Sequence, residues 1–111
     1  MADSYIDITS QDFAEKVLDA SQMVVVNFST PKSSACQIQD PEFEAISKEY
    51  QGRVMFAKLN VDENGDLTSQ WNVDVIPTII FFKRGQAINR IKGILMRDRL
   101  RRQIEGALLA Q

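Results

Sequence analysis

The feature that most constrains the fold is the passage from a β-rich run into a helical pattern near residue 33. Residues 24–28, VVVNF, are mostly β-branched or aromatic, and turn-forming residues follow them. Such a run is typical of a strand that is covered on both faces in an α/β sheet. Residues 30–33 supply turn and N-cap side chains, so we expect a helix to begin at residue 33. An apolar stripe at three- and four-residue spacing marks its buried face: Phe43, Ile46 and Tyr50.

The rest of the chain alternates β-rich runs with helical patterns. Further strands are predicted at residues 5–8, 54–61, 78–82 and 87–92, and further helices at 9–20, just before Trp71 and from Met96 onward. This order, β-α-β-α-β-α-β-β-α, predicts an α/β fold with a central mixed sheet of four to five strands flanked by helices on both faces. Three strands would be joined by helical crossovers, and the last hairpin would add an antiparallel edge.

Three local features carry expectations of their own. Thr9 or Ser10 is expected to cap the first helix through its side-chain oxygen. Pro41 is expected to bend the second helix, because it removes a backbone donor and clashes with the preceding turn. The last helix carries four arginines that we interpret as a solvated face, with docking to an acidic partner as the alternative: Arg97, Arg99, Arg101 and Arg102.

Composition limits the classes of function. The 111 residues suffice for one domain, 1–111, with a core of its own. The net charge is −2 with both signs interspersed, which gives no basic surface for nucleic acid or an anionic membrane. Neither a signal-peptide pattern nor a run of eighteen apolar residues is present. We therefore expect a soluble, cytoplasmic protein with no nucleic-acid or membrane partner.

The chain contains one cysteine and no histidine. A single cysteine cannot close a disulfide within the chain, and without histidine it cannot join a Cys/His zinc site. No metal and no cofactor are predicted. The absence of histidine also excludes a serine nucleophile activated by a histidine base.

Several short motifs occur in an order that points to one family. They are the segment VVVNFSTPKSSAC, a proline five residues after Cys36, VIPT at residues 75–78, and Gly93 after the hairpin. Together with the order of elements, they make the chain resemble thioredoxin over essentially its whole length. The resemblance implies the thioredoxin fold and thiol–disulfide exchange. It also implies partners that are protein substrates with disulfides or an extended peptide segment, and a thioredoxin reductase as a candidate electron donor.

The resemblance breaks at the motif that carries the chemistry. In thioredoxins the corresponding helix opens with WCGPC, whose first cysteine attacks a substrate disulfide and whose second resolves the mixed disulfide. Here Lys32 takes the tryptophan position, Ser33 that of the attacking cysteine, and Cys36 that of the resolving cysteine. Ser34 and Ala35 take the glycine and proline positions. Only the resolving cysteine is retained.

Two auxiliary positions follow from the same resemblance. Asn27 stands where the family has a buried acid that is thought to help deprotonate the resolving thiol. An amide cannot accept a proton at neutral pH. Lys58 matches a lysine that is commonly found near that acid.

The resemblance also predicts a binding groove. Pro77 is expected to be a cis proline packed against residues 33–36, and Ile76 to offer backbone groups to an extended segment of substrate. Lys32 and Gly93 are expected to line the same groove.

The missing sulfur leaves two interpretations open. Thiol–disulfide exchange needs one thiolate to attack and a second thiol to release the product, so turnover as a reductase is not expected. The chain is either a disulfide oxidoreductase whose attacking cysteine was replaced, by engineering or by a natural change, or a natural binding module that uses the groove at Ile76 and Pro77 without chemistry. A third interpretation, a monothiol enzyme that works with glutathione, fits poorly because Cys36 is the second cysteine of the motif. Cys36 is also interpretable as an inert core residue.

Overall fold

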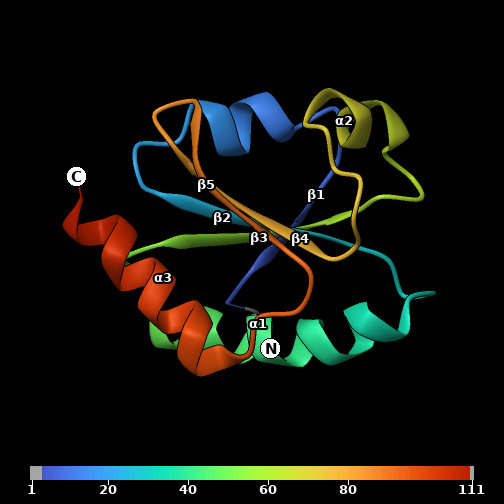
Figure 1. Cartoon of the computed structure of the whole chain (residues 1–111). Helices are drawn as coiled ribbons and strands as arrows, with labels where there is room; N and C mark the ends of the chain where they lie inside the picture. Colours follow the sequence, from blue (N-terminus) through green and yellow to red (C-terminus); the bar gives the residue numbers. More distant parts are fainter. Residues whose placement is uncertain (1–3, 111) are drawn as a thin grey trace.

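The computed structural model describes residues 4–110 as a mixed β-sheet between two layers of helices (Figure 1). The sheet has the strand order β1-β3-β2-β4-β5. Strands β1, β3 and β2 are parallel, whereas β4 is antiparallel to β2 and to β5. Three parallel strands extended by an antiparallel hairpin are the architecture predicted from the sequence. The strands are β1 (Ile6–Ile8), β2 (Val24–Ser29), β3 (Met55–Asn60), β4 (Thr78–Lys83) and β5 (Gln86–Lys92).

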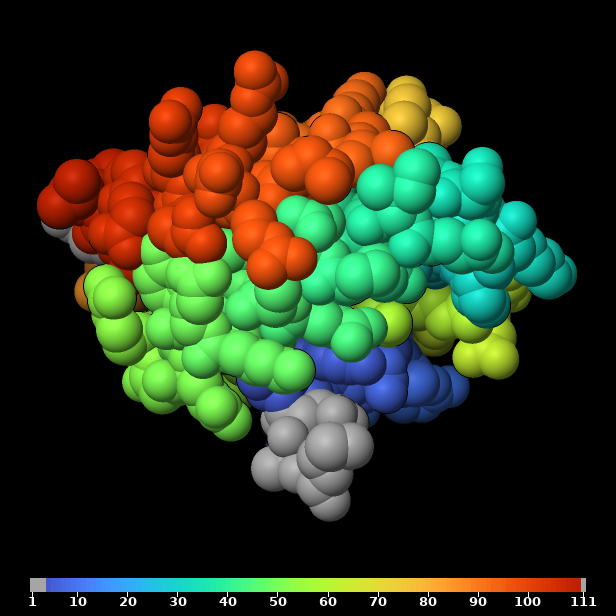
Figure 2. Space-filling view, turned by 90° about the horizontal axis from the view of Figure 1, so that it is seen from below, coloured from blue at the N-terminus to red at the C-terminus, as the bar shows by residue number. Residues whose placement is uncertain are grey.

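Helices cover both faces of the sheet, as predicted. Two long helices, α1 (Ser34–Glu49) and α3 (Arg97–Leu109), lie on one face, where Figure 2 shows them side by side. Two short helices, η1 (Ala14–Leu18) and α2 (Gly65–Gln70), lie on the other face. Between residues 4 and 110, no helix has both the length and the apolar character needed to cross a membrane.

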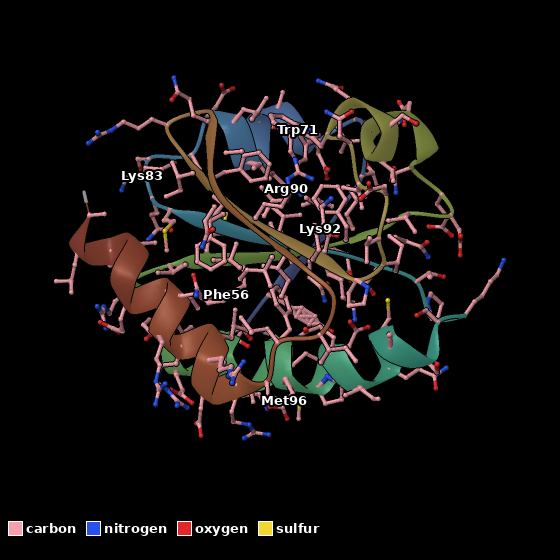
Figure 3. All side chains as sticks on the ribbon, in the orientation of Figure 1. Phe56, Trp71, Lys83, Arg90, Lys92 and Met96 are labelled. Carbon is pink, nitrogen blue, oxygen red and sulfur yellow. The ribbon has the colours of Figure 1, made fainter. Side chains whose placement is uncertain are left out.

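The two faces of the sheet bury separate hydrophobic clusters, because side chains alternate along each strand. Figure 3 shows Phe56 on the α1 side and Trp71 on the opposite side. On β2, Val25 belongs to the cluster beneath α1 and α3. Its alternate neighbours belong to the cluster beneath η1 and α2: Val24, Val26 and Phe28. All six residues of β2 are buried, which confirms the prediction of a strand covered on both faces.

The first helix is shorter than predicted, and neither Thr9 nor Ser10 caps it. Asp12 accepts a hydrogen bond from the backbone N–H of Thr9 at 2.7 Å and so closes a separate turn before the helix. Ser10 donates instead to Asn64 and Asp66, in the segment that follows β3. The helical part is therefore reduced to Ala14–Leu18. The Thr9 hydroxyl also donates to Asp12, at 3.3 Å, instead of accepting a backbone N–H of the helix.

Two of the four arginines of α3 join the helices rather than forming a purely solvated face. Arg97 binds Glu42 of α1 through its backbone N–H and its guanidinium, at 2.8 to 3.2 Å. Arg101 binds Glu49 in a bidentate pair at 2.7 and 2.8 Å. Hydrogen bonds from these arginines lower the pKa of both carboxyl groups. Arg99 and Arg102 are exposed, as predicted.

Helix α1 is continuous through Pro41, which lies on its exposed side. The bend expected there stays a prediction. Proline leaves one carbonyl of the preceding turn without its helical donor.

Candidate functional site

The site begins where β2 ends and α1 begins. Ser33 is the N-cap of α1, with extended backbone angles, and its Oγ accepts the backbone N–H of Cys36 at 3.2 Å. Serine is among the preferred N-cap residues because its oxygen satisfies a donor that the helix leaves unpaired. The predicted helix start is confirmed, and the side chain of residue 33 is occupied with capping the helix.

Asp62 fixes the loop that precedes Ser33. The Thr30 hydroxyl donates to the Asp62 carboxylate, and Thr30 Oγ1 also accepts the backbone N–H of Lys32 at 3.2 Å. Lys32 Nζ lies 3.8 Å from the same carboxylate, but its side chain is 81% exposed. An exposed pair at this distance adds little stability. Lys32 is therefore a flexible positive charge beside the helix start.

Cys36 lies one turn into α1 with no exposed surface. Its side chain is closed off from solvent, whereas Ser33 at the helix start is half-buried. The predicted order, with position 33 outside and position 36 inside, is confirmed. A reagent of ordinary size reaches residue 33 before it reaches the sulfur.

Pro77 supplies the second part of the site. The Ile76–Pro77 peptide bond is cis, as predicted, and Pro77 is buried. The Pro77 carbonyl accepts the backbone N–H of Gly93 at 2.8 Å, which joins the start of β4 to the end of β5. Gly93 has φ of +84°, a value that glycine adopts without strain and most other residues do not. Ile76 is half-buried beside them.

Gln39 joins the loop between Gly93 and α3 to the site, and this contact was not predicted from the sequence. Its side chain is fully buried in α1 and binds the backbone of Leu95 twice, accepting from N–H at 2.7 Å and donating to C=O at 3.0 Å. This amide pairs with the loop as a neighbouring strand would. A glutamine three residues after Cys36, on the face of α1 that turns inward, was the signal available in the sequence.

Hydrogen bonds thereby link three segments in series: Gln39 joins α1 to the loop from Gly93 to α3, and Gly93 joins that loop to cis-Pro77. Each carries apolar side chains that remain open to solvent, and Figure 3 shows Met96 at the start of α3 next to α1. We call these residues the apolar rim: Ile38, Val75, Ile94 and Met96. Exposed apolar side chains gathered from separate segments are typical of a binding surface.

A polar cluster lies beneath the start of α1, and its central residue was also missed. Asp40 Oδ1 accepts from Asn27 Nδ2 at 2.9 Å. Asp40 Oδ2 accepts from Ser29 Oγ at 3.2 Å and lies 3.5 Å from Lys58 Nζ. The predicted neighbours Asn27 and Lys58 are thus brought together, but through a carboxylate that comes from α1.

The charges of this polar cluster act on Lys58. Burial alone would lower its pKa, but the nearby charges of Asp40 and Glu44 outweigh burial and raise the pKa above its ordinary value. Lys58 Nζ lies 3.6 Å from Glu44 as well. Asn27 is fully buried, and its Oδ1 has no hydrogen-bond partner within the described part of the chain. A buried polar atom of this kind costs free energy, so the cluster is not optimised for stability alone.

Comparison with known proteins identifies the family. The sequence model of the Thioredoxin family matches residues 4–106. The chain is 37% identical over 108 residues to a probable thioredoxin-2 of Caenorhabditis elegans, covering 96% of this chain and 74% of the relative. It is 35% identical over 98 residues to a thioredoxin of Synechocystis sp., covering 88% and 92%. It is 30% identical over 104 residues to a thioredoxin of Chlorobaculum thiosulfatiphilum, covering 94% and 96%.

The chain belongs to the thioredoxin family. Membership implies thiol–disulfide oxidoreductase chemistry for the fold, whereas this chain has a single thiol at the site. Within residues 4–110 no group of three or more cysteine, aspartate or glutamate side chains is arranged to hold a metal ion. The candidate site therefore consists of a helix start, one buried thiol, a cis proline and a polar cluster.

Proposed function

We propose that this thioredoxin-family chain is a disulfide-exchange scaffold that binds protein segments but does not turn over, because residue 33 carries oxygen in place of sulfur. The observation that supports this proposal best is the burial of Cys36 behind the N-cap Ser33. Attack on an external disulfide needs an accessible thiolate, and release of the product needs a second thiol. The only thiol here is enclosed, and it has no partner thiol.

Binding is the part of the function that this arrangement retains. An extended segment of a protein would lie across cis-Pro77, with backbone hydrogen bonds to Ile76 and apolar contacts to the apolar rim. Lys32 would add a positive charge at the helix start, and Gly93 would let the segment approach closely. Proteins that carry disulfides or extended peptide segments are the proposed partners, together with a thioredoxin reductase. We place this activity in the cytoplasm.

Restoring the sulfur tests whether the rest of the site still supports exchange. We expect Ser33→Cys to confer reduction of insulin disulfides with dithiothreitol as the electron donor, because the helix start, the buried thiol and cis-Pro77 are all retained. The matched control is Ser33→Cys combined with Cys36→Ala, which keeps the new thiol without the resolving one and should stay at the background rate. An unchanged rate in Ser33→Cys would contradict the proposal that only the sulfur is missing.

A second candidate is a natural binding module that has lost redox chemistry throughout. The observation that favours it is the fit of serine at position 33, where the hydroxyl caps α1 more favourably than a thiol would. On this candidate, Ser33→Cys stays inactive while a bound partner is retained. Its affinity should fall when Ile76 is replaced by proline, which removes the backbone N–H, and should be unaffected by Cys36→Ala.

A further inference from the structure

The Asp40 carboxylate of α1 forms the centre of the polar cluster, and the sequence motifs give it no role. We propose that Asp40 is the proton acceptor for Cys36 when this site carries out thiol–disulfide exchange. The inference deepens the proposed function: it concerns the exchange that the site supports once Ser33 is replaced by cysteine, and it rests on that function only in treating position 33 as the place of the missing sulfur.

The first support is the position of Asp40 on α1. Residues four apart on a helix lie on the same face, with about 5–6 Å between their Cβ atoms. Asp40 follows Cys36 by four residues, so its carboxylate lies one turn further along the face that carries the thiol. Cys36 is fully buried on that face, and the Asp40 side chain is only 19% exposed.

The second support is the sheet surface under that face. Side chains of alternate strand residues point to the same side, and Val25 and Phe56 belong to the cluster beneath α1. Asn27 follows Val25 by two residues, and Lys58 follows Phe56 by two, so both also point toward α1. Asp40 is the carboxylate that the structure places against both of them.

The third support is the chemistry of the groups around Asp40. Asn27 and Ser29 donate to its two oxygens, and Lys58 supplies a positive charge at 3.5 Å. These contacts hold both carboxylate oxygens in place within the cluster. Neither an amide nor a hydroxyl beside Cys36 can take a proton at neutral pH. The charged groups near Asp40 are Lys58 at 3.5 Å, Glu44, which lies 3.6 Å from the same lysine, and Asp7 and Glu63 at the wall of the pocket that Asp40 lines.

The fourth support is a route to solvent. Asp40 lines a pocket of about 330 Å³ between α1 and the ends of the three parallel strands. The other residues at the pocket wall include Ser29, Lys58 and Asn60. A proton that Asp40 accepts from the buried interior can therefore leave to solvent through this pocket. Cys36 does not line this pocket, whereas Asp40, one turn further along α1, does.

The step conserves atoms and electrons. In a Ser33→Cys variant, a substrate disulfide is first cleaved to give a mixed disulfide at position 33 and one substrate thiolate. The Cys36 thiol then gives its proton to Asp40 as its sulfur attacks the sulfur at position 33. A bond forms between those two sulfurs, the bond to the remaining substrate sulfur breaks, and that sulfur leaves as a thiolate. Asp40 returns the proton to water, and the electron pair is carried by the departing thiolate.

The second step can be measured alone with a small chromogenic disulfide, dithiobis(nitrobenzoate), which needs no protein-binding groove. In Ser33→Cys it releases one thionitrobenzoate when the mixed disulfide forms and a second when Cys36 resolves it. We expect Asp40→Asn in that background to slow the second release about 100-fold at neutral pH, the lower end of the contribution of a positioned proton acceptor. The rate should then rise with hydroxide concentration, because solvent must take the proton.

Two further variants separate this role from a structural one. Glu42→Gln in the Ser33→Cys background is the matched control, because Glu42 is a carboxylate of the same helix that binds Arg97 outside the polar cluster, and it should leave the second release unchanged. Asn27→Asp combined with Asp40→Asn returns a carboxylate to the cluster from β2 and should recover most of the lost rate. Thermal unfolding of every variant reports folding independently.

The proposal is overturned by equal rates in Ser33→Cys with and without Asp40→Asn, or by a slowing that leaves the pH profile unchanged. Absence of the second release in Ser33→Cys itself also overturns it, since Cys36 then never attacks position 33. If the second release depends on Asp40 while insulin is not reduced, the inference holds and the proposed function fails.

Discussion

The two faces of the central sheet differ most along β2, where neighbouring residues meet opposite environments. Toward η1 and α2, the strand presents Val24, Val26 and Phe28, and the cluster there is apolar throughout. Toward α1, it presents Val25 and then changes to Asn27 and Ser29 at the end next to the helix start. One face of β2 thus packs in a hydrophobic cluster, and the other face supplies two residues of the polar cluster.

The polar side of β2 includes a buried amide that lowers the stability of the fold. A buried polar group destabilises a protein unless a hydrogen bond compensates it, and Asn27 Oδ1 is left without a partner. On the opposite face the residues that β2 presents are all apolar, and the unpaired polar atom there is Nε1 of Trp71, which packs against the cluster. Along β2, the buried polar side chains are therefore confined to the face that lies under α1.

The largest effect should come from making the apolar face resemble the polar one. We expect Val26→Asn to lower the free energy of unfolding by roughly 3–5 kcal/mol, because it removes buried apolar area and leaves an amide without partners. Urea unfolding measures the change. The matched control is Asn27→Val, which loses a donor to Asp40 but also removes an unpaired acceptor, and should change stability by less than about 1 kcal/mol. Equal losses in the two variants would remove the distinction between the faces.

An intermediate effect should follow from breaking the polar cluster. We expect Lys58→Met to cost about 2 kcal/mol at neutral pH, because Asp40 then keeps its charge with neutral donors only. The pKa of Lys58 is raised on folding, so its contribution is complete below 10.5 and is lost as the pH rises through the raised value. Unfolding in urea at several pH values should therefore give a constant difference through neutral pH that shrinks only in alkali. A difference that disappears near pH 7 would contradict this account of the cluster.

The smallest effect should come from a charge pair outside both faces. We expect Glu42→Gln to cost less than about 1 kcal/mol, because Arg97 is half exposed and solvent screens the pair. The pKa of Glu42 is lowered on folding, so its contribution is present above 4.5 and is lost as the pH falls through the lowered value. Wild type and variant should converge in acid. A loss as large as that of Lys58→Met would show that the polar cluster is no different from a surface pair.

The sequence predicted the scaffold well because its signals are local. The run at residues 24–28 and the stripe at Phe43, Ile46 and Tyr50 depend only on the period of a strand and of a helix. Cis-Pro77 and the order of Ser33 and Cys36 came from the resemblance to thioredoxin. Each of these was found where the structure places it.

The missed residues depend on contacts between distant segments. In the sequence, Asp40 looks like an ordinary helix residue. Its role becomes visible only when α1 packs on β2, because Asp40 then binds Asn27, which lies 13 positions earlier in the sequence. Gln39 binds Leu95 across 56 positions. The missing cap at Thr9 depends on local geometry that propensity does not describe, because the Thr9 hydroxyl and N–H both donate to Asp12.

Insulin reduction by the wild-type chain, with dithiothreitol in excess, tests the central claim most directly. The account predicts the same rate as dithiothreitol alone, because Cys36 is enclosed and no second sulfur exists to complete the exchange. Catalytic turnover by pure wild-type protein, proportional to its concentration and abolished by Cys36→Ala, would contradict it.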